Sequence, residues 1–186
     1  LIGQNACHTL ALKWPNDLQW GSGKLAGILV ETAQRPGNRH PCLVVGIGLN
    51  LRGARALSLD LARDIADVSE ILAGASHTAG TDAAALCPSS IVAAIALAWK
   101  KALDAYAATG YAAFQDLYQS VDVLASEPVD IVDQGRVLHT GIAQGTDSSG
   151  RLLVRTDSAV VPIMVGDVSV RRQPASGPAA TLKGTR

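Results

Sequence analysis

The chain has 186 residues, of which 48% are hydrophobic and 17% charged, and its formal net charge is zero. This length suits one ordinary domain or one and a half, and the composition allows a substantial hydrophobic core. A neutral chain offers no broad electrostatic attraction to nucleic acid or to an anionic membrane, and no apolar run is long enough to cross a bilayer.

The cysteines and histidines give no metal or disulfide pattern. Cys7, Cys42 and Cys87 lie far apart and form no CxxC pair, and their odd number argues against a secreted disulfide framework. The four histidines do not cluster at the spacing of metal ligands. Because no signal-peptide pattern opens the sequence, we expect a cytoplasmic protein without a bound metal.

The first segment has apolar residues at helical spacing, and it begins with Leu1 rather than Met. A helix is therefore expected at the start of the chain, with Leu10 and Leu12 on its apolar side. A natural protein would be unusual if it began inside such an element. We expect this chain to be the C-terminal part of a longer protein.

Two short runs rich in Ile, Val and Leu, residues 24–31 and 43–51, predict buried strands. The segment between them, TAQRPGNRHP, has the prolines, glycine and asparagine of a hairpin loop. The two strands are therefore expected to be antiparallel neighbours.

Helical periodicity follows the second strand. One helix is expected to have an apolar stripe at Leu57, Leu61, Ile65, Val68 and Leu72 and to end at Gly74. After a loop, a second helix is expected to begin after a cap at Ser89 or Ser90. Its apolar stripe would contain Val92, Ile95, Trp99, Leu103 and Tyr106, with Trp99 in the core, and a short helix is expected from Tyr111.

Residues after about 125 lose the helical period and alternate between short strands and turns. Turn residues occur at 133–135, 147–150 and 157–158, which predicts four or five strands in a small β-barrel. Residues 173–186 are rich in Pro, Ser, Gly and Ala and predict a disordered tail. The expected domains are thus 1–125, 126–172 and the tail 173–186.

Asn16, Asp17 and Lys24 lie at the entrance of the first predicted strand. A Pro-Asn-Asp sequence alone predicts only a turn, and a lone lysine at a strand end is usually solvated. The interior of this strand, however, includes Gly27, and a glycine within an apolar strand often marks a close approach by a ligand or a backbone. Strict alternation places Lys24 and Gly27 on opposite faces, so Lys24 must precede the regular strand or reach around its end.

The second predicted strand has one face without side chains. Gly46, Gly48 and Asn50 point to one side, and the alternating apolar residues point to the other. This bare face leaves room for a flat ligand, and the Asn50 amide can both donate and accept hydrogen bonds. The same pattern also suits a close crossing by another backbone, and no helix start follows that would make it a dinucleotide fingerprint.

Three motifs in order, KWPND (13–17), GKLAGILVE (23–31) and VVGIGLNL (44–51), resemble those of biotin protein ligases. The C-terminal GDVSVR (166–171) also resembles the end of that family's SH3-like domain. The resemblance implies an α+β fold, in which a mixed or antiparallel sheet with helices forms an incomplete class II synthetase-like catalytic core. A small SH3-like β-barrel would follow this core.

The same resemblance implies an enzyme, a biotin–[acetyl-CoA carboxylase] ligase. It would use ATP, with Mg²⁺, to convert biotin to biotinoyl-5′-AMP, and would then transfer biotin to a lysine of a biotin carboxyl carrier protein. The family's upstream GRGRxG-type loop is not in this sequence, so we expect the chain alone to be inactive. A homodimer is an expected assembly, and no membrane or nucleic-acid partner is expected.

The resemblance also implies site residues, with Lys24 and Asp17 as the catalytic pair. Lys24 would lie near the biotin carboxylate and the α-phosphate, and Asp17 would orient the acceptor amine. The biotin site would comprise Lys24, Gly27, Leu29, Gly46 and Gly48. The ATP and adenylate site would comprise Asn16, Lys24, Asn50 and Arg171, with Asp167 bracing the last of these.

Two alternatives remain open from the sequence. One is a non-catalytic fragment that binds biotin or a nucleotide, because the loop that covers the phosphates is lacking. The other is a relative of the lipoate ligases, which share the catalytic architecture, although the Trp-Pro-Asn-Asp stretch favours biotin. A DNA-binding repressor is not expected, since no helix-turn-helix segment is present.

Overall fold

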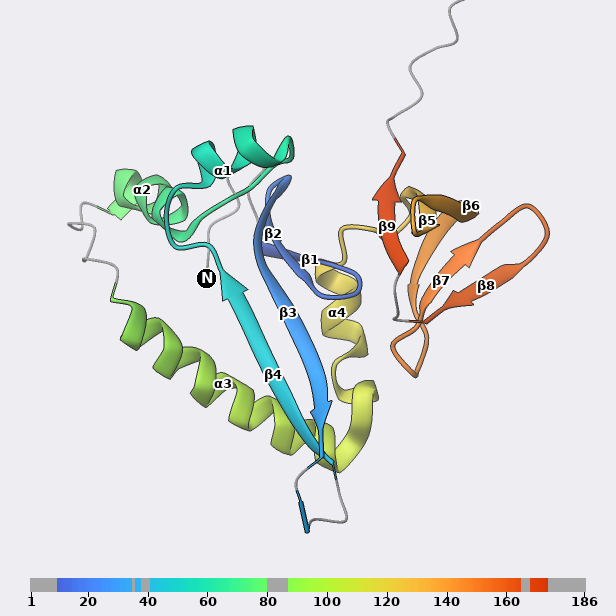
Figure 1. The fold of residues 1–186 in the computed structure, drawn as a ribbon, viewed down its shortest axis with the longest axis horizontal. Coiled ribbons are helices and arrows are strands. Elements are labelled where there is room, and N and C mark those ends of the chain that lie inside the picture. Colours follow the sequence, from blue (N-terminus) through green and yellow to red (C-terminus); the bar gives the residue numbers. More distant parts are fainter. Residues whose placement is uncertain (1–9, 35, 38–40, 80–86, 165–167, 174–186) are drawn as a thin grey trace, which may run out of the picture. The chain divides into compact units, whose positions relative to one another are not determined.

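A computed structural model describes residues 10–34, 36–37, 41–79, 87–164 and 168–173. The chain divides into two compact units, Leu1–Val123 and Leu124–Arg186. The first combines a sheet with helices, and the described part of the second is built from strands (Figure 1). The predicted tail at 174–186 and the first nine residues lie outside the described residues.

The first unit contains a four-stranded antiparallel sheet in the order β1-β2-β3-β4. Its strands are β1 (Leu10–Lys13), β2 (Asp17–Trp20), β3 (Gly23–Ala33) and β4 (Cys42–Leu49). The predicted antiparallel pairing of the two apolar runs is confirmed, because β3 pairs with β4 from Ala26↔Leu49 to Ala33↔Cys42. The helix expected to include Leu10 and Leu12 is wrong for these residues, which pair with β2 as a strand.

The strand β3 carries one extra residue opposite β2. Leu18 pairs with Ala26, and the next residue of β2, Gln19, pairs with Lys24, so Leu25 has no partner in the ladder. This is a β-bulge, which shifts the alternation of side chains by one position. Lys24 therefore lies on the same face as Gly27 through a bulge within β3, rather than by preceding the strand or reaching around its end as expected.

The helices of the first unit are α1 (Ala54–Leu61), α2 (Val68–Ala79), α3 (Pro88–Thr109), η1 (Gly110–Ala113) and α4 (Gln115–Val121). The single helix expected from Leu57 to Gly74 is wrong, because α1 ends at a left-handed Ala62 (φ 48°). Residues 64–66 instead run beside the start of β3, where Lys24 N–H donates to Asp64 O and Ala66 N–H donates to Lys24 O, each at 3.0 Å. Gly74 lies inside α2 rather than at its end.

The long helix α3 differs from its prediction at its start and in its burial. It begins at Pro88 after an extended Cys87, so neither Ser89 nor Ser90 precedes it as a cap. None of its residues is buried, and Trp99 is half-buried rather than in the core. The less exposed positions are Ile91, Ile95, Trp99 and Ala102. No described helix is long and apolar enough to cross a membrane.

The second unit is a five-stranded antiparallel sheet in the order β8-β7-β6-β5-β9. Its strands are β5 (Pro128–Asp133), β6 (Arg136–Thr146), β7 (Leu152–Arg155), β8 (Val160–Ile163) and β9 (Val168–Arg172). The predicted closed barrel is corrected to an open sheet, because no pairing between described residues joins the two edge strands β8 and β9. Its most deeply buried core residues, each at most 1% exposed, are Leu124, Val129, Ile131, Ala143, Leu152 and Val154.

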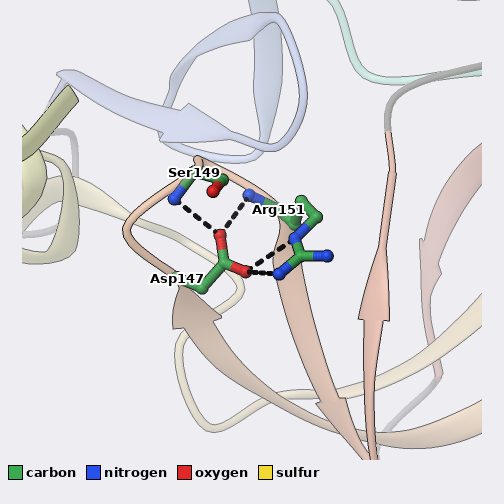
Figure 2. Close-up of polar contacts among 3 residues, drawn as sticks. All are labelled: Asp147, Ser149 and Arg151. Carbon is green, nitrogen blue, oxygen red and sulfur yellow. Dashed lines mark hydrogen bonds and ion pairs between the residues drawn. The ribbon is translucent and has the colours of Figure 1, made fainter. Parts of the chain in front are cut away.

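The predicted turn at 147–150 is held by one carboxylate, shown in Figure 2. Asp147 Oδ1 accepts hydrogen bonds from the backbone N–H groups of Ser149 (2.9 Å) and Arg151 (3.0 Å). Its Oδ2 lies 2.7 Å from both Nε and Nη2 of Arg151. Desolvation raises the pKa of Asp147, but these hydrogen bonds and the Arg151 charge outweigh it and lower that pKa below its ordinary value.

A second carboxylate, Asp67, joins the starts of two helices in the first unit. Its side chain, only 2% exposed, accepts hydrogen bonds from Ala54 N–H at 2.8 Å and from Glu70 N–H at 2.9 Å. The Ser69 hydroxyl donates a third at 2.6 Å. Burial raises the pKa of Asp67, but these hydrogen bonds outweigh it and hold the pKa below its ordinary value. Asp67 is thus the N-cap of α2 and also satisfies the first amide of α1.

Replacing Asp67 tests this double cap. We expect Asp67→Asn to lower the free energy of unfolding by about 2 kcal/mol at neutral pH, because the new NH₂ group faces amide donors. A carboxylate with a lowered pKa stabilises the fold above the unfolded pKa, and this stability is lost as pH falls through the folded pKa. The difference between the two proteins in urea unfolding should therefore shrink below about pH 4.

The exposed Asp60 of α1 provides the matched control. Asp60→Asn should change the free energy of unfolding by less than about 0.5 kcal/mol. Equal effects of the two substitutions at neutral pH would contradict the structural role of Asp67.

Candidate functional site

Lys24 and Asp17 form an ion pair on one face of the sheet in the first unit. Lys24 Nζ lies 2.5 Å from Asp17 Oδ1, and their side chains are 30% and 25% exposed. The bulge at Leu25 makes this contact possible, because it brings Lys24 to the face on which Asp17 lies. The two predicted catalytic residues are thus in direct contact.

The stem of Lys24 crosses Gly27, which is the register partner of Asp17. A Cβ atom built on Gly27 would lie 3.2 Å from Lys24 Nζ, 3.3 Å from Lys24 Cε and 3.7 Å from Asp17 Oδ1. These first two distances are tighter than ordinary van der Waals contacts. Gly27 therefore provides the space in which the lysine lies.

A row of small residues continues from this pair across the sheet. Gly27 pairs with Gly48, and Leu29 pairs with Gly46. A Cβ atom at Gly48 would meet no described atom within 4 Å, and one at Gly46 would meet only the Leu29 carbonyl oxygen at 3.9 Å. We name Gly27, Gly46 and Gly48 the glycine floor. The residues predicted to surround biotin therefore share one open face, with Leu29 58% exposed beside it.

Asn50 connects the end of β4 to the start of β3. Its Nδ2 donates to the carbonyl oxygens of Lys24 (3.0 Å) and Ala66 (3.2 Å), and its backbone N–H donates to Leu25 O (3.0 Å). Both amide protons are thus used within the protein, which leaves Oδ1 as the side chain's acceptor. The sequence indicated the polarity of Asn50 but not this role in holding the Lys24 backbone.

Asn16 has a similar but more exposed role in the turn between β1 and β2. Its Nδ2 donates to Ile28 O at 2.8 Å, and its carbonyl oxygen accepts the Ile28 N–H at the same distance. The residue therefore fastens the turn to β3 just beyond Gly27. Its Oδ1 faces no described donor within hydrogen-bond distance and remains available for a ligand.

Arg171 lies in the second unit, on β9 opposite Asp130. Asp130 Oδ1 accepts hydrogen bonds from Thr140 Oγ1 and Gln173 Nε2, both at 2.7 Å. These bonds, with a smaller contribution from the Arg171 charge, hold the pKa of Asp130 below its ordinary value. Each of these residues is described within its own unit, and Asp167 lies outside the described residues.

The segment 64–67 is the part of the site that sequence reasoning missed. It pairs with Lys24 through the backbone, and it borders a hollow of about 350 Å³. The hollow is lined by Trp20, Ser22, Gly23, Ser58, Asp64, Ile65, Ala66 and Glu70. Backbone pairing leaves no side-chain signature, but the Asp67-to-Glu70 spacing is that of a helix start and could have placed the boundary of α2.

The comparisons with known proteins cover both units. Residues 127–171 match the family profile described as the biotin protein ligase C terminal domain. The bifunctional ligase/repressor BirA of Escherichia coli is 29% identical over 160 residues, which cover 86% of this chain and 46% of that protein. The biotin–[acetyl-CoA-carboxylase] ligase of Paracoccus denitrificans is 33% identical over 153 residues, 78% of this chain and 57% of that protein.

The chain is similar to biotin protein ligases. A solved structure of the biotin protein ligase from Aquifex aeolicus in complex with biotin and ATP has a TM-score of 0.68 at 23% identity. The match covers 88% of this chain and 62% of that one, and it establishes the shared fold. The chain spans about half the length of the curated biotin ligases reported above.

The two asparagines make a matched pair for testing the site's framework. Asn50→Ala should lower the free energy of unfolding by about 1–3 kcal/mol, because it leaves the carbonyls of Lys24 and Ala66 without their side-chain donor in a part-buried site. Asn16→Ala should cost less than about 1 kcal/mol, because its bond to Ile28 is exposed. Urea unfolding of both variants measures the difference, and a larger loss for Asn16→Ala would contradict the assignment.

Proposed function

We propose that this chain provides the Lys24–Asp17 site of a biotin–[acetyl-CoA-carboxylase] ligase. The proposed reaction converts biotin and ATP to biotinoyl-5′-AMP and pyrophosphate. It then transfers biotin to a lysine of a biotin carboxyl carrier protein, with release of AMP. The observation that carries the proposal is the Lys24 ammonium held at the edge of the glycine floor.

The relatives support the chemistry. The Paracoccus denitrificans relative is named as a biotin–[acetyl-CoA-carboxylase] ligase, and the Aquifex aeolicus protein of the same fold has been solved with biotin and ATP. Because this chain spans about half the length of those curated relatives, we propose that turnover needs further parts of such a protein. Residues 1–186 alone are expected to be inactive.

In the first step, a biotin carboxylate oxygen attacks the α-phosphorus of ATP, and the bond to the pyrophosphate oxygen breaks. Negative charge grows on the phosphoryl oxygens as the new bond forms. A lysine ammonium is a compact cation that stabilises such charge. Lys24 is assigned this role, since its position on the floor's edge allows it to approach a carboxylate and a phosphate together.

In the second step, the amine of the acceptor lysine attacks the biotinoyl carbonyl, and AMP leaves. That amine must lose a proton, and a carboxylate can orient it and accept the proton. Asp17 is assigned this role. Its present partner is Lys24, so the anionic adenylate would draw the Lys24 ammonium away and leave Asp17 available for the incoming amine.

The glycine floor and Leu29 are assigned to biotin. Gly27 of β3 and Gly46 and Gly48 of β4 leave space on one face for a flat bicyclic ring, and the exposed Leu29 side chain adds an apolar surface beside them. This arrangement matches the demands of a ligand that has an apolar body and a single anionic end.

Asn50, Asn16 and Arg171 are assigned to the nucleotide. The fixed amide of Asn50 presents Oδ1 as an acceptor, which suits the exocyclic amine of adenine. Asn16 is assigned to ribose or phosphate, and Arg171 to the nucleotide's charge. Among the described residues no group of three or more His, Cys, Asp or Glu side chains could hold a metal ion, so Mg²⁺ is assigned to the ATP phosphates as part of the substrate.

The proposed macromolecular partner is a biotin carboxyl carrier protein, and a homodimer is the proposed assembly. The carrier must deliver its lysine to the face that holds Asp17 and Lys24. That face remains accessible in the described structure, as the partial exposure of both side chains shows.

Removal of the Lys24 ammonium is the main test. Lys24→Ala should lower the rate of biotin-dependent pyrophosphate release by roughly 10²–10³-fold, the loss typical of one transition-state charge contact. The rate is measured on residues 1–186 fused behind the upstream part of the Paracoccus denitrificans ligase, with biotin, MgATP and a carrier domain. Residues 1–186 alone are assayed in parallel, and turnover by them would contradict the expectation that they are inactive.

Lys100→Ala is the matched control, because Lys100 is an exposed lysine of α3 whose side chain is 73% accessible. It should leave the rate unchanged. Near-normal turnover of Lys24→Ala would refute its assigned role. Lipoate replaces biotin in a parallel reaction, and preference for lipoate would favour the lipoate-ligase alternative.

Nucleotide preference tests the role of Asn50. Inosine triphosphate carries a carbonyl oxygen where ATP carries the exocyclic amine, so it would face the Asn50 acceptor with another acceptor. We expect a loss of roughly 10- to 100-fold in kcat/KM relative to ATP, the effect of one unsatisfied polar contact. Equal use of the two nucleotides, measured by pyrophosphate release, would remove the assignment.

A further inference from the structure

We propose that Gly27 is a positioning residue for Lys24. Because Gly27 has no side chain, the Lys24 stem can cross it and bring the ammonium to Asp17. The resemblance implied that Gly27 is part of the wall around biotin, a role in which only its small size matters to the ligand. The inference rests on the proposed function in one respect only, that a displaced Lys24 slows adenylate formation.

The register of the sheet fixes the three residues relative to one another. Asp17 and Gly27 are directly opposite across β2 and β3, and the bulge at Leu25 places Lys24 on the same face. The lysine stem must then pass over position 27 to reach the carboxylate. Any side chain at this position would point into that path, since it would leave the strand on the same face.

The available space is smaller than one methyl group requires. The hypothetical Cβ at Gly27 lies 3.2 Å from Nζ and 3.3 Å from Cε of Lys24, so the lysine end would have to move by a few tenths of an ångström or leave Asp17. Partly exposed ion pairs contribute little energy and depend strongly on geometry. A small displacement is therefore enough to weaken this pair.

Gly48 supplies the contrast on the same face. Gly48 is the register partner of Gly27 on β4, and a Cβ atom at Gly48 would meet no described atom within 4 Å. Both glycines contribute to the floor, but only Gly27 contacts the lysine. The wall role and the positioning role can therefore be separated by measurements on Lys24 itself.

The test measures how fast Lys24 is acetylated by a limiting amount of acetic anhydride in residues 1–186, with Lys100 in the same sample as the reference. Gly27→Ala should raise the labelling rate of Lys24 about two- to fivefold, the range that a partly exposed ion pair controls. Gly48→Ala, the matched control, should leave this rate unchanged. An unchanged Lys24 rate in a folded Gly27→Ala protein overturns the proposal.

A double substitution tests whether Gly27→Ala changes the Lys24 labelling rate through the ion pair with Asp17. Asp17→Asn should raise the Lys24 rate by itself, and Gly27→Ala should add nothing in that background, because the ion pair is already lost. Additive effects would overturn the proposal. In the unmodified chain, a nuclear Overhauser effect between Gly27 Hα and the Lys24 ε-methylene protons is also expected, and its absence overturns the proposal without any variant.

Activity measurements connect the inference to the proposed function. In whichever form of the protein makes adenylate, Gly27→Ala should lower kcat more than it raises the KM for biotin, and it should cause no further loss in a Lys24→Ala background. A rise in the biotin KM alone would support the wall role and overturn positioning. If no form makes adenylate, the proposed function fails while the labelling results still decide the position of Lys24.

Discussion

The backbone of Lys24 is the point on which the arrangement of the first unit depends. Its N–H donates to Asp64 O, and its carbonyl oxygen accepts both Ala66 N–H and the Asn50 side chain. Three segments distant in sequence therefore meet at one residue. The same residue begins the bulged part of β3, so the backbone contacts and the direction of the side chain are fixed together. The ammonium is placed by this framework before any ligand arrives.

The pairing of strands and several residues of the candidate site could be predicted from the sequence. The pairing of β3 with β4 followed from two apolar runs and a loop rich in turn residues, and the common face of Gly46 and Gly48 followed from simple alternation. These features depend on local composition and on period-two geometry, both of which are visible in one dimension. Asp17 and Lys24 were also named, through the resemblance of their motifs to those of biotin protein ligases.

What the sequence could not provide was the contribution of backbone partners. The bulge at Leu25 has no residue signature of its own, so strict alternation placed Lys24 on the wrong face. The periodic residues from 57 to 72 suited one continuous helix, but pairing of residues 64–66 with β3 interrupts it at Ala62. Tertiary hydrogen bonds overrode local periodicity there. The open sheet of the second unit likewise depends on which strand edges meet, which turn signals do not specify.

The row Asp17–Gly27–Gly48 crosses three adjacent strands rather than following one of them. Neighbouring strands in any sheet are separated by about 4.8 Å, so this row measures roughly 10 Å from the charged Asp17 to Gly48, which has no side chain. Hydrogen bonds set that length, and side-chain rotamers cannot stretch it. The sheet therefore fixes the distance between the Lys24–Asp17 pair and the open position at Gly48. In the proposed function, this spacing separates the place of the ligand's anionic end from the place of its ring.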